Sequence, residues 1–540
     1  MKALTGAEMR EVDRLTTDRF GIPSAQLMEA AGKSVAAALC GVPFLYSAAR
    51  GRGICVLCGK GNNGGDGFVA ARFLQADGFS TVRVYLFATP TDLRGDAAEN
   101  FLRWQELGGQ TKVLGTERDW EKVWPEIAAA GVIVDALLGT GLHGPARGLM
   151  ARVIEDLNRY SCEATSPGAP AILSVDTPSG LPSDGEAAEG PVLRAHATVT
   201  FTAPKIGQLT SKDAGSCGRL YVRSIGSPAE LIEEIGHSPI RWAGPEEFAW
   251  MPLLRAAESH KGTFGHVLII AGSRGKSGAA ILAGLGCMRA GAGLTTIATP
   301  DVVLPMVASA QPELMTEAMA STPAGTVARV NMLDGRLARA GQGKTVLAVG
   351  PGLGTEPETQ DFIRGVVREA PLPVILDADG LNAFAGKADL LRQRKSDFLA
   401  VTPHPGEMAR LLGTSSAAVQ AERARVALEA AKKWNAHVIL KGFHTVLAAP
   451  NGQIWLNTTG NAALAKGGTG DVLTGVLAAA TAQFGTRDWL RVLALGIYLH
   501  GSAGELRGPQ GEDSGVLAGE VAASLPQARA ALIERIRCGG

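Results

Sequence analysis

The chain has 540 residues, of which 46% are hydrophobic and 19% are charged. This composition is typical of a folded globular protein, and the length predicts roughly two to four domains. Lys and Arg together number 52, as do Asp and Glu, so no global charge favours nucleic acid or an anionic membrane as a partner.

The N-terminal residues 1–14 carry charges throughout and lack an apolar stretch, so we expect no signal peptide. No run of about 20 apolar residues is present, and we expect no membrane span. Cys55 and Cys58 form a C-x-x-C pair inside an apolar run. Because residues three apart on a strand face opposite sides, a shared zinc ion or disulfide is disfavoured, and we expect a cytoplasmic protein with reduced thiols.

The first half of the chain alternates predicted helices and strands. Thr5 and Glu8 form a capping box that begins a short helix, and a second helix fits residues 26–39. Predicted strands cover 53–58, 81–87, 132–135, 171–176, 197–201 and 220–223, and a further helix covers 68–75. Strands that alternate with helices favour a parallel sheet with helices on both faces.

Three of these strands end in loops that carry glycine or polar side chains. The segment 59–67 reads GKGNNGGDG, Asp135 precedes Gly139, and Asp176 precedes Ser179. The carboxyl ends of parallel strands meet at one crevice of the sheet. Backbone N–H groups in such loops bind phosphate oxygens, and Asn side chains and carbonyl oxygens can hold a hard monovalent cation. A plain turn would not need this many such residues, so we predict a binding site.

Between Ile225 and about Met251 the sequence loses periodicity and gains proline and charge. We therefore predict a first domain over 1–225, a linker over 226–250 and a second domain over 251–537.

The second half repeats the alternation of apolar runs with glycine-rich or polar loops. The predicted strands cover 265–270, 346–349, 373–376, 400–402 and 438–440. The loop 271–278 resembles a P-loop, but that pattern requires glycine where Ile270 stands, so a ligand-facing glycine turn is favoured. His404 lies between two prolines and cannot belong to a regular helix or sheet, which favours a binding role.

The segment Lys466–Asp471 reads KGGTGD and leads into an apolar run. Its glycines allow close approach to a ligand, and the N–H groups of the following helix can bind a phosphate. Asp471 would then act as a base beside a transferring phosphoryl group. The alternative is a glycine turn whose aspartate caps a helix, and the hexapeptide alone leaves both interpretations open.

Taken together, these motifs resemble the bacterial bifunctional NAD(P)H-hydrate repair enzymes, in which an epimerase domain is fused to a nucleotide-dependent dehydratase. The first half carries the signature Asn62–Gly67. The second half resembles the ribokinase-like carbohydrate kinases through Gly350–Gly354, Asp377–Asn382, Thr402–Glu407, Lys441–Thr445 and Gly468–Asp471. The order of the motifs is specific, and the resemblance covers nearly the whole chain. One departure is Ala462-Ala463 after Gly460-Asn461, where the family usually has Pro-Gly, which affects the shape of this approach loop.

The resemblance implies an α/β protein of two domains, an N-terminal Rossmann-like three-layer αβα domain and a C-terminal ribokinase-like αβα domain. It also implies metabolite repair of hydrated NADH and NADPH, the 6-hydroxy compounds NADHX and NADPHX. The first domain, an isomerase, would interconvert their R and S forms. The second, a lyase, would dehydrate the S form at the expense of ADP or ATP with Mg²⁺, giving AMP or ADP and phosphate. A homo-oligomer is implied as well.

The resemblance further implies the residues of each site. In the epimerase Asp176 is the acid/base group, and a potassium ion is held by Asn63, Asp135 and Ser179. The epimerase contacts to the hydrate are Asn62, Asn63, Gly64, Gly65, Asp66, Gly139, Thr140, Gly141, Leu142, His143, Gly144, Pro145 and Asp176. In the dehydratase Asp471 is the base, and the hydrate contacts are Ala280, Gly352, His404 and Asp471. The nucleotide contacts are Lys441, Gly442, Phe443, His444, Thr445, Gly468, Thr469 and Gly470.

Two other functions compete with this interpretation. The second half alone would allow a ribokinase-like small-molecule kinase, with the first half as a regulatory nucleotide-binding domain. A non-catalytic nucleotide or lipid-carrier binding protein is the other alternative, and the presence of Asp176 and Asp471 argues against it.

Overall fold

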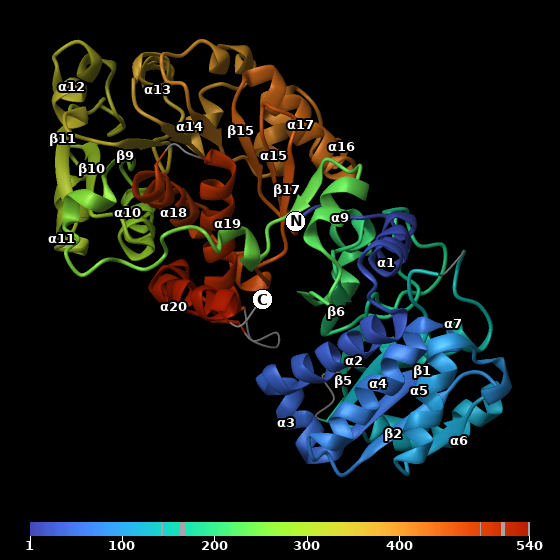
Figure 1. Cartoon of the computed structure of the whole chain (residues 1–540). Helices are drawn as coiled ribbons and strands as arrows, with labels where there is room; N and C mark the ends of the chain where they lie inside the picture. The colour runs from blue at the N-terminus through green and yellow to red at the C-terminus, as the bar shows by residue number, and fades with distance from the viewer. Residues whose placement is uncertain (142–143, 162–167, 486–487, 509–513, 538–540) are drawn as a thin grey trace. The chain divides into compact units, whose positions relative to one another are not determined.

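The computed structural model describes residues 1–141, 144–161, 168–485, 488–508 and 514–537. These residues form two compact units, unit 1 from Met1 to Ser238 and unit 2 from Pro239 to Gly540 (Figure 1). Each unit contains a largely parallel β-sheet covered by helices, so the predicted α/β fold class with two domains is confirmed.

The sheet of unit 1 has seven strands in the order β3-β2-β1-β4-β5-β6-β7, and neighbouring strands run parallel. The strands are β1 (Ile54–Cys58), β2 (Val82–Leu86), β3 (Thr111–Val113), β4 (Val132–Ala136), β5 (Ala171–Val175), β6 (Ala197–Phe201) and β7 (Arg219–Arg223). The chain order reverses between β1 and β4, and a ligand crevice forms outside the carboxyl ends of strands at such a point.

Helices pack on both faces of this sheet, because both faces of its strands are apolar. The helices of unit 1 are α1 (Gly6–Phe20), α2 (Ser24–Gly41), α3 (Pro43–Arg52), α4 (Asn62–Ala76), α5 (Gly95–Glu106), α6 (Glu117–Ala128), α7 (Leu149–Ser161), α8 (Ile206–Thr210) and α9 (Ala229–Ile235). Cys58 belongs to the core cluster shared with α2, α4 and α5, whereas Cys55 belongs to the cluster shared with α6 and α7. Both are free thiols on opposite faces, as strand geometry predicts.

The sheet of unit 2 has ten strands in the order β11-β10-β9-β12-β13-β14-β15-β16-β17-β8. The strands are β8 (Ile240–Trp242), β9 (His266–Ile270), β10 (Leu294–Pro300), β11 (Met315–Met319), β12 (Val346–Val349), β13 (Val374–Leu376), β14 (Leu399–Val401), β15 (His437–Leu440), β16 (Thr445–Ala448) and β17 (Ile454–Asn457). Only β16 runs antiparallel to its two neighbours in this sheet, as far as the described residues show. The chain order reverses between β9 and β12.

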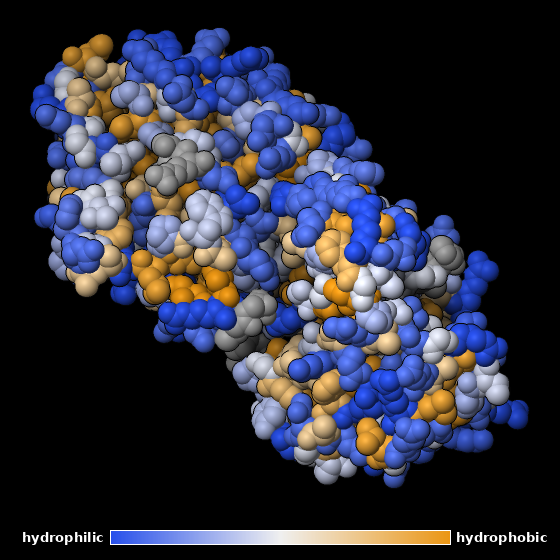
Figure 2. Space-filling model, viewed as in Figure 1, coloured by the Kyte–Doolittle hydropathy of each residue, from blue (hydrophilic) through white to orange (hydrophobic). Residues whose placement is uncertain are grey.

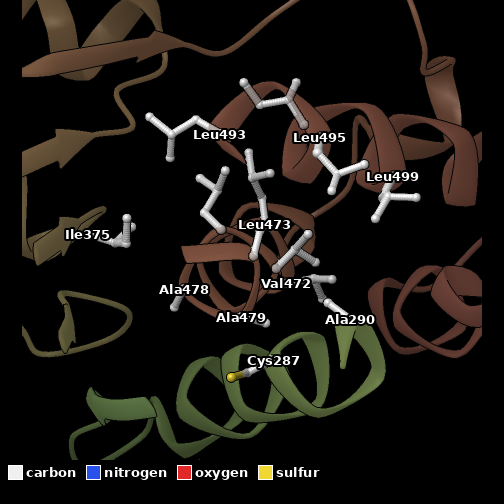
Figure 3. Packing of buried hydrophobic residues seen from close by; sticks show 14 of the residues in the cluster. Cys287, Ala290, Ile375, Val472, Leu473, Ala478, Ala479, Leu493, Leu495 and Leu499 are labelled. Atoms are coloured by element: carbon white, nitrogen blue, oxygen red, sulfur yellow. The ribbon is translucent and has the colours of Figure 1, made fainter. Parts of the chain in front are cut away.

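The helices of unit 2 are α10 (Ser277–Ala290), α11 (Leu304–Ala310), α12 (Arg336–Gly341), α13 (Pro357–Glu369), α14 (Asp379–Asn382), α15 (Pro405–Leu412), α16 (Ser416–Ala421), α17 (Arg423–Trp434), α18 (Thr469–Phe484), α19 (Trp489–Glu505) and α20 (Ala518–Arg537). Figure 3 shows α18 packed between α10 and α19, with Val472 and Leu473 among the buried side chains. A Cβ on Gly475 would lie 2.0 Å from the Ala283 carbonyl oxygen, so this glycine lets α18 and α10 approach closely. The helix that follows the KGGTGD segment is therefore a rigid central element of unit 2.

Three features of the fold differ from the sequence prediction. The segment 226–250, expected as a linker, contains α9, which packs on α1, and β8, which pairs with β17. The strands β3, β10, β11, β16 and β17 had not been expected, and of these β3 and β11 are mostly exposed. Helix α4 begins at Asn62 rather than at about Phe68, so residues 62–67 of the predicted loop 59–67 are helical.

Among the described residues, no single helix is long and apolar enough to cross a membrane, although the bent pair α2 and α3 passes the same test together. Both helices contribute buried side chains to the core of unit 1. Figure 2 shows mostly hydrophilic residues on the visible face, with separate hydrophobic patches.

Candidate functional sites

The first candidate site lies at the carboxyl ends of β1, β4 and β5 in unit 1. After β1, the chain turns at once into α4, and the glycines there allow close packing. A Cβ on Gly64 would lie 1.9 Å from the Gly59 carbonyl oxygen, and one on Gly59 would lie 2.0 Å from the Leu137 carbonyl oxygen. The segment is therefore a helix N-terminus pressed against the sheet, and N–H groups of its first turn lack intrahelical acceptors.

Asn63 lies in the first turn of α4, and its buried Oδ1 and Nδ2 atoms make no hydrogen bond within the described part of the chain. It packs against the loop after β4, since a Cβ on Gly139 would lie 3.2 Å from the Asn63 Cγ. A buried amide without partners costs free energy, which points to a missing polar ligand at this position.

Asp135, at the end of β4, is completely buried and belongs to the same site. The Ser179 hydroxyl donates to Asp135 Oδ1 at 2.5 Å, and the Ser179 N–H and the Ser174 hydroxyl donate to Oδ2 at 3.0 and 2.8 Å. Burial raises the pKa of Asp135, and these hydrogen bonds oppose the shift. The structure thus brings Asp135 and Ser179 into direct contact, and the Leu138 N–H joins them by donating to the Ser179 Oγ at 3.0 Å.

Asp176 follows β5 and has a φ of 60°, a left-handed conformation that is uncommon outside glycine. Its Oδ1 forms an ion pair with Lys205 and accepts a hydrogen bond from the Thr200 hydroxyl at 3.0 Å. The Lys205 side chain is 1% exposed, so a buried cation faces the carboxylate. Backbone strain at a charged, partly buried residue is typical of a functional position.

Lys205 was missed by the sequence analysis, because it stands alone after Pro204 without a glycine-rich or polar motif around it. Only the fold shows its contact with Asp176, 29 residues away.

The remaining predicted residues of this site lie on α4 and in the loop after β4. Asp66, on α4, is nearly buried, and burial raises its pKa well above the usual value, with Asp176 as a second cause. The loop after β4 places Gly139, Thr140 and Gly141 beside the site, and the Arg10 guanidinium donates to the Thr140 carbonyl oxygen at 3.4 Å. Leu142 and His143 lie outside the described residues.

The second candidate site lies at the carboxyl ends of β9 and β12–β15 in unit 2. Hydrogen bonds join the loops in series. The Ser273 hydroxyl donates to the Gly352 carbonyl oxygen at 2.7 Å, and the Gly354 N–H donates to Asp379 Oδ2 at 2.8 Å. The Lys276 ammonium group also contacts Asp379, at 3.0 Å. The strand ends predicted from the sequence are therefore assembled into one surface.

Lys441, at the end of β15, is the main cation of this site. Its Nζ donates to Asp377 Oδ1 at 2.7 Å and lies 3.7 Å from Glu407 Oε2. Asp377, nearly fully buried, also accepts a hydrogen bond from the Thr474 hydroxyl of α18 at 2.6 Å. Burial alone would lower the pKa of Lys441, but Asp377, Glu407 and Asp471 raise it, so the lysine stays charged.

Asp471 lies in the first turn of α18, where Gly468 has a φ of 92° and allows the sharp entry into the helix. Burial raises the pKa of Asp471 to about 7, Asp377 adds to the shift, and Lys441 opposes it. A carboxyl with this pKa can accept a proton near neutral pH.

His404 begins α15, and its Nδ1 accepts a hydrogen bond from the Gly406 N–H at 3.0 Å. The His404 side chain is half-exposed, and its Nε2 lies 3.6 Å from Glu407 Oε1. His404 is the N-cap of α15 and so lies outside the regular helix, as its position between two prolines predicts, and its binding role stays a prediction.

The nucleotide loop predicted at Lys441–Thr445 connects β15 to β16. Phe443 is 62% exposed, and its ring stacks on His444 with centroids 4.0 Å apart. The guanidinium of Arg423 donates to the carbonyl oxygens of Phe443 and Leu440, which fixes the loop from behind. An exposed, fixed aromatic ring offers a surface on which a base can stack.

Ala280 and the approach loop occupy supporting positions. Ala280 is 0% exposed and lies below Gly272, whose added Cβ would be 3.2 Å from it. Ala462 and Ala463 belong to a short 3-10 helix that Asn461 caps through its side chain. The Asn461 Nδ2 also donates to the Gly508 carbonyl oxygen at 2.7 Å, so the loop is anchored at the departure from the family pattern.

Within the described parts of the chain, no group of three or more His, Cys, Asp and Glu residues could hold a metal ion. Asn63 and Ser179 instead offer amide and hydroxyl oxygens, which also ligate cations.

Comparison with known proteins identifies relatives along both units. The family model described as NAD(P)H-hydrate dehydratase matches residues 267–527, and the model described as YjeF-related protein N-terminus matches residues 24–207. The "Bifunctional NAD(P)H-hydrate repair enzyme Nnr" of Moorella thermoacetica is 40% identical, covering 97% of this chain and 96% of the relative. The protein of the same name from Thermofilum pendens is 37% identical, covering 99% and 97%.

Among solved structures, an ADP/ATP-dependent NAD(P)H-hydrate dehydratase from Bacillus subtilis, co-crystallised with ATP and Mg²⁺, is 34% identical to this chain. The match covers 54% of this chain and 98% of that chain, with a TM-score of 0.45.

Proposed function

Because the chain belongs to the family of bifunctional NAD(P)H-hydrate repair enzymes, we propose that its two units perform two consecutive steps of one repair. Unit 1 is the epimerase domain and interconverts the R and S forms of NADHX and NADPHX. Unit 2 is the ribokinase-like dehydratase domain and returns the S form to NADH or NADPH at the expense of ADP or ATP. The observation that carries the proposal is the presence of two separate strand-end sites, each with a lysine among carboxylates.

In unit 2 the chemical problem is the leaving group, because hydroxide leaves a carbon atom poorly. Asp471 takes the proton of the ring hydroxyl while that oxygen attacks the terminal phosphorus of the nucleotide, and AMP or ADP leaves. The hydroxyl oxygen then departs as phosphate, and loss of a neighbouring ring proton restores the double bond. A base whose pKa is about 7 suits the first of these steps.

The first turn of α18 is suited to the charge that develops on the phosphoryl group. Gly468, Thr469 and Gly470 precede Asp471, and N–H groups at a helix N-terminus stabilise anionic oxygens. Lys441 is close to this turn, since a Cβ on Gly470 would lie 3.6 Å from its Nζ. The loop from Lys441 to Thr445 holds the nucleotide, with Gly442, Phe443 and His444 around the base and sugar.

The hydrate lies between Gly352, His404 and Asp471, with Ala280 as the packing support below Gly272. Mg²⁺ would accompany the nucleotide and neutralise charge on its phosphates, and the acidic groups near Lys441 are compatible with a cation there. Among these groups Glu407 is held in the capping box of α15.

In unit 1, Asp176 is the acid/base group that acts on the hydroxyl-bearing carbon. A potassium ion suits the group formed by Asn63, Asp135 and Ser179, because all three have oxygen ligands and the Asn63 amide has no partner among the described residues. Bound there, the cation would fix the loop after β4 and provide positive charge near the substrate. The phosphates of the substrate would contact the α4 N-terminus at Asn62, Asn63, Gly64, Gly65 and Asp66 and the loop of Gly139, Thr140, Gly141, Leu142, His143, Gly144 and Pro145.

We also propose that the protein works in the cytoplasm as a homo-oligomer. The free thiols at Cys40, Cys55, Cys58, Cys217 and Cys287 suit a reducing compartment.

The function is tested with the purified protein and a mixture of R and S hydrates, with ADP, ATP or no nucleotide. The expected result is nucleotide-dependent recovery of the absorbance of the reduced ring until both epimers are consumed. A stable phosphate ester without reduced cofactor, detected by phosphorus NMR, would identify the kinase alternative instead.

A further inference from the structure

Helix α1 borders the epimerase site of unit 1, although no residue of it was assigned a role. The segment that leads into α1 makes backbone hydrogen bonds with the two residues next to Lys205 in the chain. The Leu4 N–H donates to the Pro204 carbonyl oxygen at 3.0 Å, and the Ile206 N–H donates to the Leu4 carbonyl oxygen at 2.9 Å. The Arg10–Thr140 hydrogen bond described above ties the same helix to the loop after β4. These hydrogen bonds hold helix α1 beside the crevice that contains Asp176.

Asp13 is the acidic residue of α1 whose carboxylate is directed into the protein. It is flanked by Val12, Met9 and Thr16, which are buried. Its Oδ1 is buried and has no hydrogen-bond partner in the described part of the chain. An unpaired buried carboxylate oxygen destabilises a fold, so a structural role does not account for Asp13.

The charged groups that face Asp13 are those of the epimerase site. Lys205 and Asp176 both act on it electrostatically, and Asp66 of α4 interacts with Asp13, Asp176 and Lys205. Burial raises the pKa of Asp13 to about 6, Lys205 lowers it and Asp176 raises it. The Asp13 Oδ1 has no partner among the described residues, and this carboxyl group can carry a proton near neutral pH.

The reaction proposed for unit 1 requires acid/base chemistry on both faces of the substrate ring. The R and S hydrates carry the hydroxyl on opposite faces of the same carbon. A carboxylate fixed on one face can assist departure or addition of the hydroxyl only on that face. The strained, lysine-bound Asp176 cannot move to the other face without losing its contacts.

We propose that Asp13 is the second acid/base group of the epimerase and serves the ring face opposite to Asp176. This inference rests on the epimerase activity proposed for unit 1. One carboxyl group protonates the departing hydroxyl, the C–O bond breaks with its electron pair on oxygen, and water leaves. The lone pair of the ring nitrogen forms a C=N double bond. A water molecule then adds to the opposite face and gives its proton to the other carboxylate.

The step balances, because one water leaves and one enters while one proton is given and one is taken. Each turnover exchanges the protonation states of Asp13 and Asp176, so the two forms of the enzyme act on opposite epimers. No oxidant, reductant or further reactant is needed.

The test compares Asp13→Asn with Asp18→Asn, which changes an exposed carboxylate of the same helix that is paired only with Arg14. We expect Asp13→Asn to slow R-to-S conversion at least ~100-fold, the scale of losing a general acid or base. Asp18→Asn should retain the parental rate, and Asp13→Glu should recover part of it. The melting temperature of Asp13→Asn should equal or exceed that of the parent, since an unpaired buried charge is removed.

A parental epimerisation rate in Asp13→Asn overturns the inference. So does a loss of rate accompanied by a lower melting temperature, because that result assigns Asp13 a structural role. Epimerisation by the parent in ¹⁸O-labelled water should introduce one solvent oxygen, and retention of the original oxygen contradicts the C–O cleavage step. If the parent itself fails to interconvert the epimers, the proposed function of unit 1 fails, independently of Asp13.

Discussion

The two candidate sites use the same residue types, but their lysines contact different carboxylates. In unit 1, Lys205 pairs with Asp176, the proposed acid/base group, and leaves Asp13 and Asp66 with raised pKa values. In unit 2, Lys441 is held by Asp377 at 2.7 Å, and Asp471 keeps a pKa of about 7.

In each site, one carboxylate is bound to the lysine and a second buried carboxyl group is not. In both units, a buried carboxyl group that lies farther from the lysine has a raised pKa and can carry a proton near neutral pH. In unit 2 the proposed base is the distant group, whereas in unit 1 the distant group is Asp13. Burial is the main cause of both shifts, and the lysine of each site opposes it.

The largest expected effect is that of Asp471→Asn. Loss of the proposed base should reduce nucleotide-dependent dehydration of the S hydrate by at least ~100-fold. Epimerisation should stay at the parental rate, because its residues lie in unit 1. Both rates are measured on one preparation, and a parallel fall of the two would contradict the assignment of separate sites.

Asp176→Asn should produce the complementary loss. Asn tolerates the left-handed backbone conformation at this position, so the substitution removes the charge without adding strain. We expect epimerisation to fall ~100-fold, while pure S hydrate is still dehydrated at the parental rate. Slow dehydration of the pure S form by this variant would contradict the assignment of Asp176 to epimerisation alone.

Asp377→Asn should shift a pH profile rather than abolish activity. Removing this charge lowers the pKa of Asp471, because Asp377 raises it in the parent. The parental kcat/KM for dehydration should therefore fall as the pH drops below about 7, and in the variant the fall should begin roughly one pH unit lower. Asp389→Asn, which changes an exposed carboxylate paired with Lys433, is the matched control and should leave the profile in place. An unchanged acid limb in Asp377→Asn would show that Asp377 does not set the basicity of Asp471.

The smallest effect concerns the proposed potassium site. Ser179→Ala removes one oxygen ligand and the hydroxyl that donates to Asp135. The potassium concentration that gives half-maximal epimerisation should rise roughly tenfold, with dehydration unchanged. If epimerisation by the parent does not respond to potassium, the proposed potassium site is wrong.

The local signals of both sites could be read from the sequence, because glycine and aspartate follow apolar runs at each strand end. The fold class, the strand-end positions of Asp135 and Asp176, and the place of Asp471 at the start of a helix follow from that pattern. The segment Asn62–Gly67, which was predicted as part of a glycine-rich binding loop, is the first part of α4. The structure uses its glycines for close packing against the sheet.

Long-range contacts could not be predicted. The Lys441–Asp377 ion pair joins residues 64 positions apart, and no local pattern indicates which carboxylate the lysine selects. The position of Asp13 could not be predicted either, since the sequence of α1 shows only an ordinary amphipathic pattern. Only the fold brings this helix beside Lys205. Short strands such as β3, with an exposed Lys112, lack the apolar run that would reveal them.

The central claim, that one chain contains two separate sites for consecutive steps, is tested most directly by mixing two variants. Asp471→Asn alone should regenerate almost no NADH from mixed epimers with ADP, and Asp176→Asn alone should stop when the S form is exhausted. Together they should convert both epimers completely, because each supplies the site that the other lacks. A mixture that stops at the same point as Asp176→Asn alone would contradict the account.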